Sequence, residues 1–289
     1  MKHPLIVLAL MLLSLAPVCE GQHESFLRRS ELIVGGGGMG YIGDLNEQSA
    51  LGIPRGGVLV GMRTRFDNRW AMRWQLAYGS IASPDDDVIV LRNLSFRSTL
   101  WEFSGVAEFN FVPFGNGSGR LWSPYIFGGF ALFHFNPETS YIDADGNRQW
   151  VELQPLHTEG QATSVYPDRQ PYSLFQLSLP FGVGVKFWAG KIFSLTVQYG
   201  FRKTWTDYLD DVSTTYVEPE AFGTGADGAL AQQLADRSGE VVPGYVNAPG
   251  IKRGDDSLDD WYSFFDISIG INMETLFGWM HKTRCKMNN

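Results

Sequence analysis

Two acidic stretches are the densest groups of potentially reactive side chains in the chain. The first is TDYLDDV at 206–212, with Asp207, Tyr208, Asp210 and Asp211, and the second is RGDDSLDDW at 253–261. Paired carboxylates can serve acid–base catalysis or bind calcium. Neither stretch has the alternating oxygens, glycine and final glutamate of an EF-hand loop. We therefore expect solvated loop charge rather than a metal site, and the tripeptide RGD at 253–255 is a weak signal for adhesion.

Other motifs give no support for catalysis. None of the five histidines is paired at metal-ligand spacing, and no G-x-S-x-G turn is present, although a Ser-His-Asp arrangement stays open. GGGGMG at 35–40 contains the G-x-G-x-x-G pattern, but it lies inside a predicted strand and no helix follows. Glycines there suit close strand packing or a bend. The sequence predicts no enzyme, no cofactor and no metal.

The second of the two cysteines, Cys285, lies in the C-terminal stretch MHKTRCKMNN together with the basic residues Lys282, Arg284 and Lys286. The first, Cys19, belongs to an N-terminal segment with a basic start, an apolar core at 5–15 and a break at Pro17. That pattern predicts a secretory signal peptide over residues 1–21. A lipoprotein anchored at Cys19 and an uncleaved anchor are the alternatives. Cleavage would leave Cys285 unpaired, either as a free thiol or as an intermolecular bridge.

Period-two alternation of apolar and polar residues predicts the strands that lie between these segments. It is strong at 69–79, 98–111, 177–187, 192–202 and 260–273, and weaker at 31–42, 56–66 and 124–135. The prediction is therefore eight strands, and no other run of about 20 apolar residues follows the N-terminal segment. Within the last gap, DGALAQQLADRS at 227–238 predicts a short helix that Asp227 could cap.

The gaps between the strands alternate in length. The second, fourth and sixth are short, at 67–68, about 113–122 and 189–191. The first, third, fifth and seventh are long, at about 43–55, 81–96, 136–173 and 206–259. Strict alternation is typical of an outer-membrane barrel, with long loops outside and short turns in the periplasm. We expect an all-β fold, an eight-stranded antiparallel transmembrane β-barrel over 22–273, followed by a periplasmic tail at 274–289.

The polar face of each strand then points into the barrel. Its charged residues are Arg63, Arg65, Arg73, Glu102, Glu108, Lys186, Arg202 and Asp266. Side chains fill the interior of a barrel of eight strands, so these charges are expected to pair across the lumen rather than line a pore. Aromatic residues near strand ends would form the interfacial girdles of the outer surface: Trp70, Trp101, Tyr125, Trp205 and Trp261. The formal net charge of −8 argues against a nucleic-acid partner.

Several segments together resemble one family. They include GYIGDLN at 40–46, TLWEFSGVAEFNFVPF at 99–114, LQPLHTEGQ at 153–161 and, most specifically, TDYLDDVSTTY at 206–216. They resemble the PorG-like outer-membrane β-barrel family of the Bacteroidetes, in the family's order, over about residues 32–273. The family usually has glycine where this chain has His157, which leaves the conformation of that loop open.

The resemblance implies a non-enzymatic outer-membrane component of the type IX protein secretion system, which also supports gliding motility. Its expected partners are a periplasmic ring-forming lipoprotein, the ring partner of that lipoprotein, and outer-membrane lipid. Both chain ends would be periplasmic, and Cys285 is then a candidate for a disulfide with the lipoprotein. The alternatives are a stand-alone OmpX-like or adhesin-type barrel that displays its loops, and an outer-membrane enzyme, for which no polar triad can be assembled.

Overall fold

Eight antiparallel strands close into a barrel in the computed structural model, which describes residues 26–46, 54–84, 92–114, 120–190 and 192–277. Closure is made by β1 (Ser30–Ile42), which pairs with both β2 (Arg55–Arg65) and β9 (Trp261–Asn272). The strands between them are β3 (Trp70–Pro84), β4 (Ser95–Asn110), β5 (Trp122–Ile142), β7 (Phe175–Ala189) and β8 (Phe193–Thr204). The predicted fold class is confirmed, with each predicted strand in its place.

The two faces of the barrel wall differ in polarity. Inward positions carry the buried charged and polar residues, whereas outward positions carry large apolar side chains that are about half exposed, among them Val60, Trp74 and Phe103. Burial in water-free lipid removes the cost of exposing such a band, and a closed barrel leaves no unpaired strand edge within it. The architecture is therefore that of a membrane-spanning barrel. None of the helices in the described part of the chain is long and apolar enough to cross a membrane.

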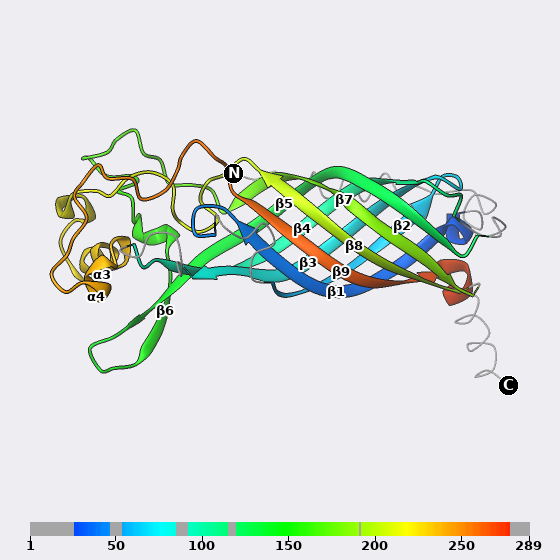
Figure 1. The fold of residues 1–289 in the computed structure, drawn as a ribbon, viewed down its shortest axis with the longest axis horizontal. Helices are drawn as coiled ribbons and strands as arrows, with labels where there is room; N and C mark the ends of the chain where they lie inside the picture. The colour runs from blue at the N-terminus through cyan, green and yellow to red at the C-terminus, as the bar shows by residue number, and fades with distance from the viewer. Residues whose placement is uncertain (1–25, 47–53, 85–91, 115–119, 191, 278–289) are drawn as a thin grey trace, which may run out of the picture.

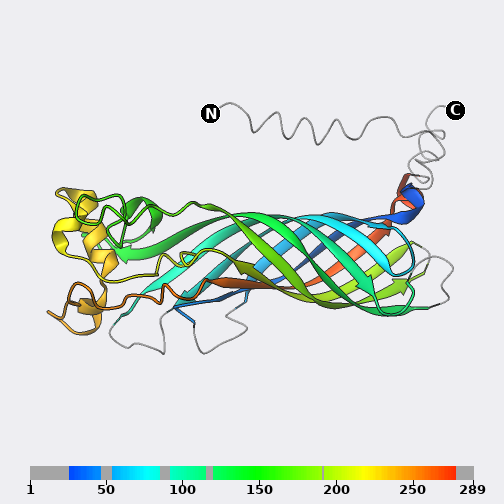
Figure 2. The same ribbon diagram turned by 90° about the horizontal axis from the view of Figure 1, so that it is seen from above.

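Short and long connections lie at opposite ends of the barrel (Figure 1). The short ones link β2 to β3, β4 to β5 and β7 to β8, as the alternation of gap lengths predicts. The described ends of the chain, Phe26 and Phe277, lie at this same end, which we call the turn end. The two longest connections, from β5 to β7 and from β8 to β9, lie at the other end, the loop end (Figure 2).

These two connections form a folded cap on the loop end. The longest, between β8 and β9, contains η2 (Pro219–Phe222), α3 (Ala226–Ala235) and α4 (Ser238–Val241), and the β5–β7 connection contains η1 (Gln154–Leu156). The predicted loop helix is confirmed as α3, but its N-cap is Gly225 rather than Asp227, and no side chain caps it. Asp227 instead lies in the first turn, where a negative charge faces the positive end of the helix dipole.

Strand β5 is longer than the sequence predicts. It runs for 21 residues and continues beyond the barrel, where its last five residues pair with β6 (Arg148–Glu152) to form a projecting hairpin (Figure 1). The prediction that Tyr125 faces lipid is also wrong. Its side chain is buried in the lumen and donates a hydrogen bond from its hydroxyl to Oε1 of Gln198 at 2.6 Å. Trp70, Trp101 and Trp205 are about half exposed on the outside.

The glycine run of β1 brings two strands into close contact. A Cβ atom on Gly37 would lie 1.8 Å from the carbonyl oxygen of Phe265 on β9, which no side chain could tolerate. The interpretation of GGGGMG as a site of close strand packing, rather than a nucleotide-binding turn, agrees with this geometry. The run therefore lets β1 and β9 approach each other where the barrel closes.

Candidate functional site

The lumen is crossed by ion pairs around Glu108 on β4. Its carboxylate lies 2.8 Å from Nε of Arg63, 2.6 Å from Nε of Arg73 and 2.6 Å from Nζ of Lys186. These cations come from β2, β3 and β7, so one carboxylate connects four strands. All four side chains are buried. Charges buried in this way need partners, and here the partners lie across the barrel.

Two further carboxylates extend the network. Glu102 accepts hydrogen bonds from Nε of Arg202 and from the hydroxyl of Tyr262, each at 2.9 Å. Asp266 accepts one from Nε2 of Gln198 at 2.5 Å. The alternation of the strands identified both acids as inward, but it missed Glu31 at the start of β1, which lies 3.2 Å from Arg63 and 3.6 Å from Arg65.

An apolar layer lies between the charged layer and the cap. It is made of buried side chains from the loop end of the strands and from the cap, including Met39, Leu100, Phe135, Leu209 and Phe264. The lumen thus contains two successive barriers, one of paired charges and one of packed apolar groups. Nothing in this arrangement resembles a water-filled pore.

The acidic segment TDYLDDV is the base of the cap, and the prediction of solvated charge is wrong for most of it. Asp210, Asp211 and also Asp260 of the second acidic stretch are buried. The hydroxyl of Tyr41 lies 2.6 Å from Oδ2 of Asp210 and 2.9 Å from Oδ1 of Asp260. One phenol has a single proton to donate, so at least one of the two carboxyl groups must carry a proton of its own.

The pKa values in this cluster agree with the conclusion that at least one of these carboxyl groups carries a proton. Burial, with Asp44 nearby, raises the pKa of Asp210 to about 8, and burial raises the pKa of Asp207 to about 9. Burial and the neighbouring Asp210 hold the pKa of Asp260 well above its usual range. Backbone N–H groups of Val212 and Leu209 donate to Asp210 and Asp260, each at 2.9 Å. The segment is therefore a folded core of the cap, not a catalytic pair aimed at solvent.

A second buried group joins two loops of the cap. Nη1 of Arg253 lies 2.9 Å from Oε1 of Glu159, and Asp211 accepts hydrogen bonds from Thr158 at 2.5 Å and from the hydroxyl of Tyr172 at 2.7 Å. Arg253 is the arginine of the RGD tripeptide, and its burial keeps it from contact with another molecule. Tyr208 joins the same group by donating to Oε2 of Glu159 at 3.3 Å.

His157 lies at the end of η1 in the left-handed region, with φ 52°. Glycine enters that region without steric cost, which explains why glycine suits this position. No group of three or more histidine, cysteine or acidic side chains within the described ranges is placed to hold a metal ion. Cys285, Lys282, Arg284 and Lys286 lie outside the described residues, as does Cys19.

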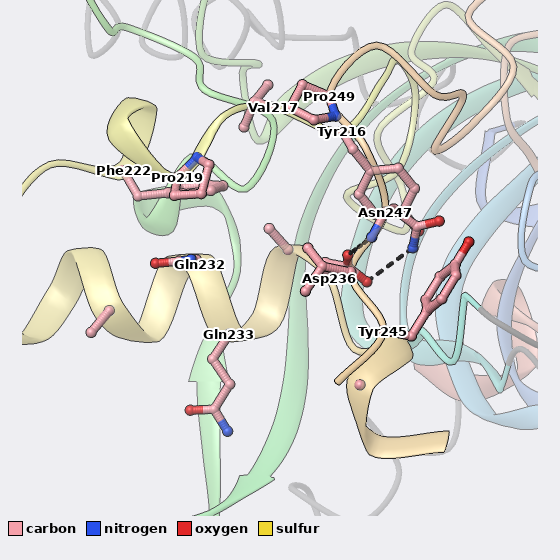
Figure 3. Close-up of a pocket in the computed structure, with 14 residues that line it drawn as sticks. Tyr216, Val217, Pro219, Phe222, Gln232, Gln233, Asp236, Tyr245, Asn247 and Pro249 are labelled. Carbon is pink, nitrogen blue, oxygen red and sulfur yellow. Dashed lines mark hydrogen bonds between the residues drawn. The ribbon is translucent and has the colours of Figure 1, made fainter. Parts of the chain in front are cut away.

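The cap also contains a pocket of about 350 Å³ between α3, η2 and the chain that returns toward β9 (Figure 3). Its walls include Tyr216, Phe222 and Tyr245, with Gln232 and Asn247 as polar groups. Asp236 is the only acid among the described residues of its lining, and its two oxygens accept hydrogen bonds from Ser238 and from the backbone and side-chain nitrogens of Asn247. The carboxylate therefore fixes the loop, and the pocket has no group arranged for catalysis.

The fold and its interior thus define a class: an eight-stranded transmembrane barrel with a filled lumen and a folded cap. Residues 7–156 match the family described as "Domain of unknown function (DUF6089)", which covers more than half of the chain. The chain belongs to that family. No curated protein matches the sequence.

Similar solved structures include three bacterial barrels. OprG of Pseudomonas aeruginosa has a TM-score of 0.40 at 12% identity, over 85% of this chain and 97% of that one. Ail of Yersinia pestis, the attachment invasion locus protein, has 0.39 at 11%, over 84% and 96%. Neisserial surface protein A has 0.39 at 8%, also over 84% and 96%. Likenesses of this size carry no information on function.

Proposed function

We propose that the protein is a non-enzymatic outer-membrane component of the type IX secretion machinery that links the membrane to periplasmic ring proteins. The observation that supports this role is the filled lumen. A barrel closed by paired charges around Glu108 and by packed apolar side chains offers no path for a solute or a polypeptide. Its contribution to transport would then be to hold other components in place at the membrane.

The assignment to the type IX machinery rests on the sequence resemblance. The segment that carries this resemblance most specifically has a structural role in the fold. TDYLDDVSTTY forms the base of the cap through Asp210, Asp211 and Tyr208. The cap would face the cell exterior and the turn end the periplasm. The described chain ends at Phe277 on the turn end, so the basic tail with Cys285 would enter the periplasm, where an acidic partner surface and a partner thiol could meet it.

The test is affinity purification of the tagged protein from outer membranes after chemical crosslinking, with crosslinked peptides identified by mass spectrometry. Periplasmic ring proteins joined to residues near the turn end are the expected result, together with loss of cargo secretion in a strain that lacks the protein. Crosslinks confined to the cap, with secretion intact, would instead favour a barrel that displays surface loops.

A non-reducing gel tests the bridge separately. With thiols blocked before lysis, wild-type cells should contain a higher-mass band that contains the ring lipoprotein and disappears in Cys285→Ser. The control is a variant with Lys282, Arg284 and Lys286 changed to glutamine, which retains the thiol and should retain the band at lower yield. Absence of the band in the wild type would exclude the disulfide and leave charge as the only link through the tail.

A further inference from the structure

Strand β6 lies at the end of the sheet and has a free edge. Its five residues pair with β5 and, within the described ranges, with no other strand. The N–H of Asp143 donates to the carbonyl of Asn147 at 2.9 Å, and the N–H of Leu153 donates to Pro137 at 2.8 Å, which marks a hydrogen-bonded pair at each end of the hairpin. Because such pairs alternate along an antiparallel ladder, every second residue of β6 turns its N–H and C=O away from β5. These residues are Arg148, Trp150 and Glu152.

This edge is open to solvent and projects from the barrel (Figure 1). All three of these side chains are exposed, and no other described residue hydrogen-bonds to their backbone N–H or C=O groups. An edge of this kind is a template for another strand. The turn before β6 is fixed, because Asp143 accepts hydrogen bonds from the backbone of Asp145 at 3.0 Å and of Asn147 at 2.8 Å. The edge is therefore extended before a partner arrives, which lowers the entropic cost of pairing.

The two ends of β6 carry opposite charges. Arg148 at the start and Glu152 at the end have no ion pair with another described residue, and Glu152 accepts only a neutral hydrogen bond, from the amide of Asn136 at 2.9 Å. If two copies of β6 pair antiparallel and centred on Trp150, Arg148 of each copy lies opposite Glu152 of the other. Opposite charges in that position attract. A parallel pairing would instead place Arg148 opposite Arg148, so the charges select the antiparallel arrangement.

The same register satisfies the backbone. The residues that would face each other, Arg148 with Glu152 and Trp150 with its own copy, are those whose N–H and C=O groups point outward. Each of these pairs can therefore exchange two hydrogen bonds. The two indole rings would meet at the centre on one face, where aromatic cross-strand pairs stabilise a sheet. Trp150 is 45% exposed although the guanidinium of Arg97 lies 3.4 Å from its ring centroid, so part of the ring is available.

We infer that β6 is a self-complementary edge through which two copies of the chain pair, antiparallel and centred on Trp150. The resulting interface is isologous, with the same residues contributed by both copies. It does not depend on the proposed secretion role, on the lumen or on the C-terminal tail. The contact is small, so the association is weak and depends on the local concentration of the chain.

A cysteine at the centre of the pairing tests the register. In a chain with Cys19→Ser and Cys285→Ser, Trp150→Cys places two new thiols opposite each other. The Cα atoms of such a hydrogen-bonded pair lie about 5.5 Å apart, which is within the range of a disulfide. Gln149→Cys is the matched control, because residue 149 would lie opposite Val151 of the second copy and two positions away from its own counterpart.

The readout is the fraction of disulfide-linked dimer on non-reducing gels. The full chain is equilibrated in detergent micelles, where the two barrels are free to take any relative orientation, and a glutathione redox buffer supplies the oxidant. Trp150→Cys should form about tenfold more dimer than Gln149→Cys, because only the first pair meets the geometry of a disulfide. Different migration of heated and unheated samples verifies that each variant is folded.

Charge reversal tests whether the occupant is a second copy. In the Trp150→Cys chain, Arg148→Glu would turn two attractive pairs into two repulsive ones and should lower the dimer fraction about fivefold. Adding Glu152→Arg exchanges the two charges and should restore the dimer. Within one copy the two residues lie about 14 Å apart along the strand, too far to pair, so a local effect on the hairpin would give no such rescue.

Three results would overturn the inference. The first is an equal yield of dimer from Trp150→Cys and Gln149→Cys, which would indicate random collision. The second is a dimer fraction that Glu152→Arg fails to restore. The third is a disulfide of Trp150→Cys in outer membranes that joins a different protein in place of the second copy, which would assign the edge to a strand of another partner.

Discussion

Glu108 is the residue on which the charged layer of the lumen depends, because Arg63, Arg73 and Lys186 all lie within 3 Å of its oxygens. Glu108→Gln would leave these buried cations without their shared anion. We expect the free energy of unfolding to fall by about 3–5 kcal/mol, the usual cost of breaking a buried ion pair. Urea titration of the protein in lipid vesicles, followed by tryptophan fluorescence, measures it.

The control for this prediction is an ion pair on the outside of the barrel. Lys203 and Asp259 lie 3.1 Å apart and each is about one third exposed. Lys203→Ala should cost no more than about 1 kcal/mol, because solvent screens such pairs. Losses of similar size in the two variants would contradict the importance of the buried network.

Asp210 makes the cap sensitive to pH. Its pKa in the folded protein is raised to about 8, above the usual value near 4. A raised carboxyl pKa contributes stability that is complete below pH 4 and is lost as the pH rises through 8. Hydrogen exchange of the 206–216 segment, corrected for the intrinsic rate, should therefore show weaker protection at pH 9 than at pH 6.

The matched variant is Asp210→Asn, which stays neutral and can still accept the hydrogen bond from Val212. Its protection should change much less between the two pH values. The surrounding titratable and charged groups, which are Tyr41, Asp44, Asp207, Arg92 and Asp260, remain in both proteins. An unchanged pH response in Asp210→Asn would assign the effect to Asp207 or Asp260 instead.

Sequence reasoning succeeded with the lumen residues and failed with the acidic loop for a physical reason. Alternation along one strand places Glu102, Glu108 and Lys186 on the inner face without knowledge of other strands. The burial of Asp210 depends on Tyr41 and Asp260, which are far away in the sequence. No local sequence pattern predicts such long-range contacts, so a run of aspartates in a loop is predicted to be exposed to solvent.

At the scale of elements, the hairpin of β5 and β6 contacts β4 at its base, where Glu138 pairs with Arg97, and projects from the barrel beyond that point. Within the described ranges, strand β6 pairs with no strand residues other than 138–142 of β5. Replacing residues 141–149 by a short turn should therefore leave the barrel intact, with unfolding in urea within about 0.5 kcal/mol of the wild type, as for other surface changes. Trp150, whose ring lies 3.4 Å from the guanidinium of Arg97, is outside the replaced residues and is retained.

A matched truncation tests whether the cap behaves differently. Replacing residues 226–241, which form α3 and α4, removes Leu234 from its buried position and the carbonyl of Ala235 that Arg253 binds. This variant should lose protection at the base of the cap, which the hairpin variant should retain. Equal effects of the two truncations would mean that the hairpin supports the cap.

The two errors on β5 have different causes. Aromatic side chains occur on both of its faces, with Tyr125, Phe127 and Phe133 inside and Phe130 outside. Period two then cannot fix which face is apolar, so the phase was assigned wrongly at Tyr125. The extension toward β6 begins with three polar residues, Glu138, Thr139 and Ser140, and its pairing depends on a segment of the next loop.

At the scale of the whole molecule, the two barriers in the lumen predict an electrically silent protein. Planar bilayers containing the purified protein should show no steady conductance, whereas a porin recorded in the same membranes should. Glu108→Gln leaves the apolar layer in place and should also stay silent. A stable current from the wild type would contradict the filled lumen.

The seam between β1 and β9 has a consequence for biogenesis. Glu31 pairs in register with Asn272, so the first and last strands of the barrel are neighbours. Every earlier strand can pair with the one before it, but the cylinder cannot close until the C-terminal strand has been made. A nascent chain with such long-range pairing folds slowly and keeps two edges exposed meanwhile. Closure of the barrel must therefore wait until the last strand is available, whatever order the other strands form in.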